Sequence, residues 1–241
     1  MDETTLVKGK ILTKSLFTDE LVRLKIKNVK PLQVPYKPGQ FISIKASEKQ
    51  YTPYYVFKYD ENINAFEVAA SLSGDGAGPN YLKSIGVGDD IEYTVPEGNL
   101  QLNLEAKAVF LIATGTCLSP YVSFLYYVQK SPIKPEITLF WGVKNEQQLY
   151  LINTLYAFST SIPNFSYYVF LEGGHTSVRH RPGLVTDAIK EVQFDDRALV
   201  YVCSDPKNVN DILTVLKAKE VTQDRIVFEK YLDVVEKEIS Q

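Results

Sequence analysis

Hydrophobic and polar residues alternate with a period of two along the first hundred residues, as they do in half-buried β-strands. The runs are interrupted at Asn, Asp, Pro or Gly, which is typical of antiparallel strands joined by turns. We therefore predict an antiparallel barrel or sandwich in this half of the chain. The expected strands are 7–12, 21–27, 41–45, 54–57, 66–70 and 91–95.

The pattern changes near residue 105, where alternation gives way to the continuous apolar run 109–113, typical of a buried parallel strand. Strands and helical stretches then alternate, which predicts a doubly wound parallel sheet. The fold class predicted is an N-terminal β-barrel, residues 1–104, followed by a C-terminal α/β domain, residues 105–241. The expected strands of the second domain are 109–113, 137–142, 166–171, 198–203 and 225–228, and its helices 121–128, 146–158, 184–192 and 206–217.

Two of these strand ends carry residues suited to bind a nucleotide. The run 109–113 ends at Thr114-Gly115-Thr116, and the run 198–203 ends at Ser204-Asp205-Pro206. In open α/β sheets ligands bind beyond the carboxyl ends of the strands, where free N–H groups at a helix start favour anions. We expect a pyrophosphate beside the first segment, and we expect the Asp and Pro of the second to begin a helix.

Composition narrows the class of protein. The chain has 241 residues, 45% of them hydrophobic, which is enough for two hydrophobic cores. A formal net charge of -3 argues against a generally basic nucleic-acid binder. The two cysteines, Cys117 and Cys203, are far apart in the sequence, so we expect neither a disulfide framework nor a metal centre, which suits the cytoplasm. No apolar run reaches the roughly 20 residues that span a bilayer, and no leader pattern is present.

Four sequence blocks occur in a characteristic order. They are Pro38-Gly39-Gln40-Phe41, Ala113-Thr114-Gly115-Thr116 with Pro120, Cys203-Ser204-Asp205-Pro206 and Phe228-Glu229-Lys230-Tyr231. Together they resemble the ferredoxin-NADP reductase superfamily, and within it the bacterial ferredoxin/flavodoxin reductases. The resemblance implies a flavin-binding barrel and an NAD(P)-binding domain, with FAD and either NADPH or NADH as cofactors. It also implies a small electron-transfer protein, ferredoxin or flavodoxin, as partner, and we expect a monomer or weak dimer.

The resemblance assigns the flavin ring to the strand at 54–57. The Arg-x-Tyr-Ser block of the superfamily matches Thr52-Pro53-Tyr54-Tyr55, followed by Val56, so Tyr54 is expected to stack on the flavin while the backbone beside Tyr55 bonds the ring. Thr52 replaces the Arg and lacks its charged planar fork, which removes a contact worth about 1.5–3 kcal/mol. Lys58 is an alternative source of this charge. For Tyr55 and Lys58, flavin contact and plain packing both stay open.

A glycine-rich loop precedes the next predicted helix. The superfamily has Gly-x-x-Ser here, and the matching residues are Gly76, Gly78, Pro79 and Asn80, with Asn80 nearest to the role of Ser. A loop that enters a helix can hold phosphate, so the flavin phosphates are expected here. A glycine-rich hairpin loop is the alternative.

The resemblance also assigns one residue to the nicotinamide, which gives the hydride, and one to the flavin, which receives it. Cys203 is expected beside the reacting nicotinamide, followed by Ser204 where the superfamily has Gly. Tyr231 is expected to cover the flavin until the nicotinamide displaces it. We expect Tyr54, Thr116 and Cys203 to line one crevice, and Tyr54, Cys203 and Tyr231 to be the catalytic residues.

The choice of nicotinamide cofactor depends on Leu171 and Glu172, which the resemblance places where NADP-using relatives tend to have Ser and Arg. A carboxylate repels a 2′-phosphate and accepts hydrogen bonds from a free ribose, which favours NADH. Arg179 and Arg181 follow closely and are suited to clamp a phosphate, which favours NADPH, or they form a solvated basic loop. Both cofactors stay open.

Two other functions are compatible with the sequence. The missing Arg at Thr52 is consistent with an NAD(P)H:flavin reductase that uses flavin as a loosely held substrate. Thr52, Tyr55 and Pro79 differ from the superfamily motifs at their positions. These differences are also consistent with an interaction module that has the fold but no catalytic activity.

Overall fold

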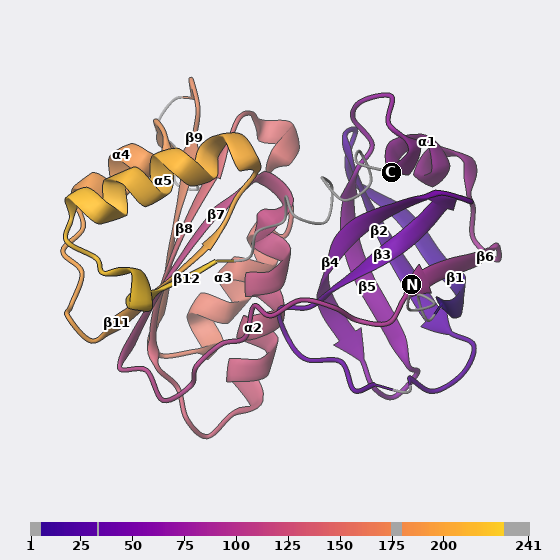
Figure 1. Cartoon of the computed structure of the whole chain (residues 1–241), viewed down its shortest axis with the longest axis horizontal. Coiled ribbons are helices and arrows are strands. Elements are labelled where there is room, and N and C mark those ends of the chain that lie inside the picture. Colours follow the sequence, from indigo (N-terminus) through magenta and orange to yellow (C-terminus); the bar gives the residue numbers. More distant parts are fainter. Residues whose placement is uncertain (1–5, 33, 175–179, 229–241) are drawn as a thin grey trace. The chain divides into compact units, whose positions relative to one another are not determined.

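The computed structural model of the chain describes residues 6–32, 34–174 and 180–228 (Figure 1). It divides into two compact units. One contains Met1–Leu102 and Ser119–Tyr126, and the other contains Asn103–Leu118 and Tyr127–Gln241. A single boundary after residue 104, as proposed from the sequence, assigns the segment Ser119–Tyr126 to the second domain, whereas the contacts group it with the first.

The first unit is a closed antiparallel barrel, as predicted. Its strands are arranged in the order β1-β2-β5-β4-β3-β6, so the first and last strands pair and no edge is left open. Every predicted strand is present, and several extend further than the alternation indicated. The bounds are β1 (Leu6–Thr18), β2 (Leu21–Asn28), β3 (Phe41–Ser47), β4 (Gln50–Asp60), β5 (Ala65–Ser71) and β6 (Asp90–Thr94).

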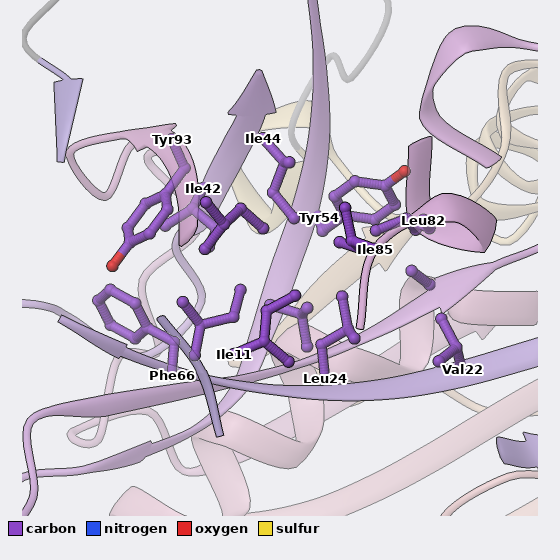
Figure 2. Close-up of a cluster of buried hydrophobic side chains, with 14 of the residues drawn as sticks. Ile11, Val22, Leu24, Ile42, Ile44, Tyr54, Phe66, Leu82, Ile85 and Tyr93 are labelled. Carbon is purple, nitrogen blue, oxygen red and sulfur yellow. The ribbon is translucent and has the colours of Figure 1, made fainter. Parts of the chain in front are cut away.

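The barrel core consists of inward-facing side chains from every strand (Figure 2). Ile11, Leu24 and Phe66 are at most 1% exposed and meet in its centre. One end is closed by the helix α1 (Ala77–Ser84), whose Leu82 enters the core together with Ile85. Alternate burial along the strands therefore follows from the period-two pattern of the sequence.

The second unit holds a six-stranded sheet in the order β10-β9-β8-β7-β11-β12, in which all pairs are parallel. This confirms the predicted doubly wound α/β fold. The bounds are β7 (Ala108–Thr114), β8 (Glu136–Val143), β9 (Phe165–Leu171), β10 (Arg181–Pro182), β11 (Ala198–Cys203) and β12 (Ile226–Phe228).

The direction of winding reverses between β7 and β11. The chain runs outward from β7 through β8 to β9, and then returns to place β11 and β12 on the other side of β7. Because parallel crossovers are right-handed, a reversal of direction moves the connecting helices to the opposite face. The helices after the return, α4 (Val185–Lys190) and α5 (Pro206–Ala218), lie together on one face, where they cover Ile112, Phe140 and Phe170 (Figure 1).

The region after β8 differs from the prediction of one helix over 146–158. It forms a 3-10 turn at Glu146–Gln148, and the helix α3 (Ile152–Ser161) begins only after Leu151, which has a φ of 56°. The left-handed residue breaks the helix, because hydrogen bonds of the i→i−4 ladder cannot continue through it. The intervening Tyr150 is only 2% exposed.

The basic segment before residue 182 also differs from the expected loop. Arg181 and Pro182 form the short edge strand β10 beside Phe170 and Leu171 of β9. Among the described residues, no helix is both long enough and apolar enough to cross a bilayer.

Candidate nucleotide-binding and flavin-side residues

The carboxyl ends of β7 and β11 carry a pair of hydroxyl groups at the point where the winding reverses. The two strands are neighbours, with Ala113 paired with Cys203. The next residue on each strand carries a hydroxyl, and Oγ1 of Thr114 lies 2.6 Å from Oγ of Ser204. The structure thus brings the predicted Thr114 and Ser204 together at this reversal, the place where open α/β sheets generally bind their ligands.

Asp205 links this pair to the start of α5. Its Oδ1 accepts hydrogen bonds from the backbone N–H groups of Lys207 (3.1 Å) and Asn208 (3.2 Å), so it is the N-cap of the helix. Its own N–H donates to Oγ1 of Thr114 at 3.4 Å. The cap role expected for this Asp from the sequence is confirmed, and it fixes the turn after Ser204.

The loop after β7 continues as a 3-10 turn, Gly115–Leu118, which runs directly into the helix α2 (Ser119–Lys130) with Pro120 in its first turn. Gly115 has a φ of +50°, a conformation that residues with a side chain adopt rarely. Two side chains hold the loop by hydrogen bonds. Nε1 of Trp141 donates to the carbonyl oxygen of Gly115 at 3.0 Å, and Oη of Tyr150 donates to the carbonyl oxygen of Thr116 at 2.9 Å.

Cys203 and Glu172 end two strands of the same sheet. Cys203 is 5% exposed at the end of β11, where its small side chain is part of the sheet end. Glu172 follows β9 and is exposed, and its N–H donates to the carbonyl oxygen of Val143 at 2.9 Å. An exposed carboxylate is therefore present at this end of the sheet.

Of the two arginines expected to clamp a phosphate, only Arg181 lies among the described residues. The guanidinium carbon of Arg181 lies 5.1 Å from the ring centre of Tyr168, in a cation–π contact on β9. Arg179 and Tyr231 lie outside the described residues.

The flavin-side residues Thr52, Tyr54 and Gly78 are in contact with one another in the barrel unit. A Cβ atom placed on Gly78 would lie 2.6 Å from the hydroxyl of Tyr54 and 2.7 Å from Oγ1 of Thr52. The first turn of α1 therefore rests directly on the inward face of β4. The loop and the strand that were expected to share a flavin are brought together, and no side chain fits between them.

Tyr54 is placed differently from the outward ring that stacking needs. Its ring is 8% exposed and belongs to the barrel core, beside Leu82 and Ile85 (Figure 2). Burial raises the pKa of Tyr54 to about 12, and the neighbouring Thr52 hydroxyl offsets part of that rise. Period-two alternation explains the placement, because Tyr54 pairs with Ile42, another core residue.

Tyr55 faces away from that core cluster but is only 4% exposed, and its ring meets Phe41 edge-on at 5.8 Å between centroids. Lys58, considered as a replacement for the missing guanidinium, has its Nζ 5.2 Å from the ring centre of Tyr126. Arg23 forms an ion pair with Glu67. Both cations therefore have partners, and no described contact directs either of them to Thr52.

The rest of the predicted phosphate loop is ordered by its own contacts. Gly76 is the N-cap of α1, and no acidic residue stands in the first helical turn. The Nδ2 of Asn80 donates to the carbonyl oxygen of Asp75 at 3.0 Å, so its amide closes the loop. Within the described ranges, no group of three or more His, Cys, Asp or Glu side chains is arranged to hold a metal ion.

Comparison with known proteins agrees with this geometry. The oxidoreductase NAD-binding domain family matches residues 111–212. The toluate 1,2-dioxygenase electron transfer component of Pseudomonas putida is 24% identical over 216 residues, which cover 89% of this chain and 64% of that protein. A cytochrome P450 reductase of Amycolatopsis shares the fold with a TM-score of 0.83 at 19% identity, over 94% of this chain and 70% of that one. The ferredoxin-NADP+ reductase of Plasmodium falciparum does so with a TM-score of 0.79 at 23% identity, over 94% and 96%.

Over most of its length the chain is therefore similar to electron transfer components and shares the fold of ferredoxin-NADP+ reductases, and residues 111–212 match the oxidoreductase NAD-binding domain family. It spans a little under two thirds of the curated relative named above, 64% of its length. The reversal between β7 and β11 places Thr114 and Ser204 at the end of the sheet where doubly wound folds generally bind ligands.

The sequence did not point to two residues that hold the loop after β7. Trp141 lies within the predicted strand 137–142 and is fully buried, but its N–H also donates to the carbonyl oxygen of Gly115. Tyr150 was hidden inside a predicted helix, although its hydroxyl holds Thr116. The available signal was chemical, since a buried Trp or Tyr must find a hydrogen-bond partner.

Proposed function

We propose that this chain is a flavin-dependent oxidoreductase that transfers hydride between NAD(P)H and FAD and then passes electrons to a small redox protein such as ferredoxin or flavodoxin. The observation that carries the proposal is the hydroxyl pair of Thr114 and Ser204 at the winding reversal, 2.6 Å apart, inside the region that matches an oxidoreductase NAD-binding domain. The relative from Pseudomonas putida, an electron transfer component, supports the same class of reaction.

On the nicotinamide side, the residues present fit a dinucleotide. Gly115 and Thr116 form the turn that receives the pyrophosphate, and the mutually hydrogen-bonded hydroxyl groups of Thr114 and Ser204 lie at the same sheet end. Cys203, small and polarisable, lets the nicotinamide approach without a clash. Glu172 accepts a hydrogen bond from a free ribose hydroxyl, so we propose NADH as the better reductant.

On the flavin side, the fit is incomplete. Thr52 and Tyr54 lie under the first turn of α1, and the described cations Lys58 and Arg23 contact Tyr126 and Glu67 instead. A bound flavin would supply a hydride acceptor that can pass electrons on singly. The barrel residues contribute the ring-facing strand β4 and the loop at Gly76, and we propose that they hold FAD weakly.

A second candidate function follows from that weak fit. In an NAD(P)H:flavin reductase the flavin enters and leaves as a substrate, which agrees with the lack of a guanidinium at Thr52.

One experiment tests both functions. The purified chain is incubated with FAD or FMN and passed over a gel-filtration column, and oxidation of NADH and NADPH is then followed with cytochrome c as a one-electron acceptor. Retained flavin with turnover independent of added flavin supports the electron-transfer enzyme. Loss of flavin on the column, with turnover that saturates in added flavin, supports the flavin reductase. Oxidation of neither cofactor under any condition would refute both and favour a non-catalytic module.

Three further features remain proposals. We propose that Tyr231 covers the flavin, that the protein acts in the cytoplasm, and that it is a monomer or a weak dimer. Replacement of Tyr231 by Ala tests the first, since a ring that competes with nicotinamide should, when removed, change the KM values for both cofactors. Sedimentation over a range of protein concentrations measures the third.

A further inference from the structure

Two aromatic side chains from separate segments hold consecutive carbonyl groups of the nucleotide loop. Trp141, on β8, donates from Nε1 to the carbonyl oxygen of Gly115 at 3.0 Å. Tyr150, between the 3-10 turn Glu146–Gln148 and α3, donates from Oη to the carbonyl oxygen of Thr116 at 2.9 Å.

The two donors are rigidly placed. Their rings meet edge-on, with centroids 5.7 Å apart and an interplanar angle of 81°. Trp141 is 0% exposed and Tyr150 is 2% exposed. Since neither side chain reaches bulk water, breaking either hydrogen bond leaves a buried polar group without its partner. Both carbonyl groups are therefore held toward these two rings.

The orientation of a carbonyl group fixes that of the N–H group in the same peptide unit. A trans peptide is planar, and its C=O and N–H bonds point in opposite directions. The bond from Trp141 therefore directs the N–H of Thr116 to the side away from the indole. The bond from Tyr150 fixes the peptide unit that follows, so the turn cannot rotate about Thr116 without breaking it.

We propose that Trp141 and Tyr150 are positioning residues for the nucleotide pyrophosphate, which orient the N–H of Thr116 toward the bound anion. This inference rests on the proposed function, because the pyrophosphate is that of NADH or NADPH. It explains why the turn after β7 works with a single glycine: two side-chain hydrogen bonds supply the rigidity that a series of tight glycine turns supplies elsewhere.

The test compares Tyr150→Phe and Trp141→Phe with Tyr156→Phe. Tyr156 is the matched control, since it lies on α3 nearby and is 64% exposed. Two probes are titrated calorimetrically: ADP-ribose, which carries the pyrophosphate, and adenosine, which does not. We expect Tyr150→Phe and Trp141→Phe to bind ADP-ribose about 5- to 10-fold more weakly, as the loss of one positioned hydrogen bond implies. Adenosine affinity and all values for Tyr156→Phe should stay at the wild-type level.

A second readout uses the nucleotide-free protein. Amide hydrogen exchange at Thr116 should accelerate in Tyr150→Phe and Trp141→Phe, while exchange in the barrel strands is unchanged. Trp141 is the only tryptophan of the chain, so its fluorescence in the wild type reports directly on the loop and should change when ADP-ribose binds.

The outcomes separate this inference from the proposed function. Equal losses for ADP-ribose and adenosine would indicate a general packing defect and overturn the positioning role, as would unchanged ADP-ribose affinity in both variants. If the wild type binds no ADP-ribose, the proposed function fails. In that case the exchange rate of the Thr116 amide still tests whether Trp141 and Tyr150 hold this peptide. Unchanged exchange in both variants would overturn that role, and faster exchange would support it.

Discussion

The N–H of Gly39 donates a 2.8 Å hydrogen bond to Oγ of Ser123, which lies 84 residues further along the chain. The same hydroxyl donates to the carbonyl oxygen of Pro120 at 2.6 Å. Gly39 lies in the turn before β3, and Ser123 lies in α2, within the part of the helix that groups with the barrel. Gly39, in one of the four blocks that carry the resemblance, is therefore also an anchor for this helix.

The first prediction concerns the space at Gly39. A Cβ atom there would lie 2.0 Å from the carbonyl oxygen of Leu100 and 2.7 Å from Cε1 of Phe124, and the φ of Gly39 is +96°. Gly39→Ala should lower the free energy of unfolding by about 2–4 kcal/mol, from backbone strain and overpacking together. Urea denaturation measures the change.

Gly88→Ala is the matched control for this variant. Gly88 has a nearly identical φ of +93°, but a Cβ atom there meets nothing within 4 Å. Gly88→Ala should therefore lower the free energy of unfolding by the backbone strain alone, about 1–2 kcal/mol. Equal losses in the two variants would show that the neighbours of Gly39 make room at no cost.

The second prediction concerns the contact of α1 with β4. Gly78→Ala should lower the free energy of unfolding by about 1–3 kcal/mol, because the added methyl group meets the hydroxyls of Tyr54 and Thr52 at 2.6 and 2.7 Å. Gly76→Ala is the control in the same loop, since its Cβ atom would meet only Cδ of Pro79 at 3.7 Å. Denaturant midpoints that fall equally for both variants would contradict this account of the packing.

The fold was predictable because both halves of the sequence carry strong periodic patterns. Alternation in 21–27 marks β2, with Leu24 and Ile26 turned inward, and the continuous run 109–113 marks β7 as a strand buried on both faces. The failure at 146–158 is instructive. The left-handed Leu151 breaks the helix at a residue with no sequence signal for a break, since neither Gly nor Asn stands there.

The candidate site was only partly predictable, because a sequence motif gives the identity of a residue but not the face on which it lies. Thr114, Ser204 and Asp205 are brought together because strand ends in a parallel sheet share an edge. Tyr54 was expected to face the flavin, yet its register opposite Ile42 turns it into the barrel core. The bonds from Trp141 and Tyr150 to the loop depend on tertiary contacts that no local pattern contains.

The third prediction is a pH dependence. Burial raises the pKa of Tyr54 to about 12, from a value of 10.0 without the protein environment. The folded state thus keeps the phenol proton more tightly than the unfolded state, so this stabilisation is complete below pH 10 and is lost as the pH rises through about 12. A shift of this size corresponds to about 2–3 kcal/mol.

Tyr54→Phe isolates this contribution. Its difference in free energy of unfolding from the wild type should be constant below pH 10, and should then shift in favour of the variant between pH 10 and about 12. Urea denaturation at a series of pH values measures it. Tyr36 and Tyr93, whose pKa values are also raised by removal from water, are present in both proteins and do not affect the comparison. A difference that stays constant up to pH 12 would show that Tyr54 ionises as easily in the folded state as in the unfolded chain.

The last prediction concerns the choice between NADH and NADPH. Glu172 is exposed at the end of β9, where we propose that its carboxylate repels the 2′-phosphate of NADPH. Glu172→Gln should raise the ratio of kcat/KM for NADPH to kcat/KM for NADH by about 3- to 10-fold. The variant removes the repulsion between two negative charges, which is about 1 kcal/mol for charges about 4 Å apart in water. The gain should shrink at high ionic strength, which screens exposed charges.

Glu136→Gln, which removes an exposed carboxylate from the amino end of β8, should leave the ratio unchanged. Equal ratios in the wild type and Glu172→Gln would mean that another group selects the cofactor, and Arg181 is then the next residue to replace.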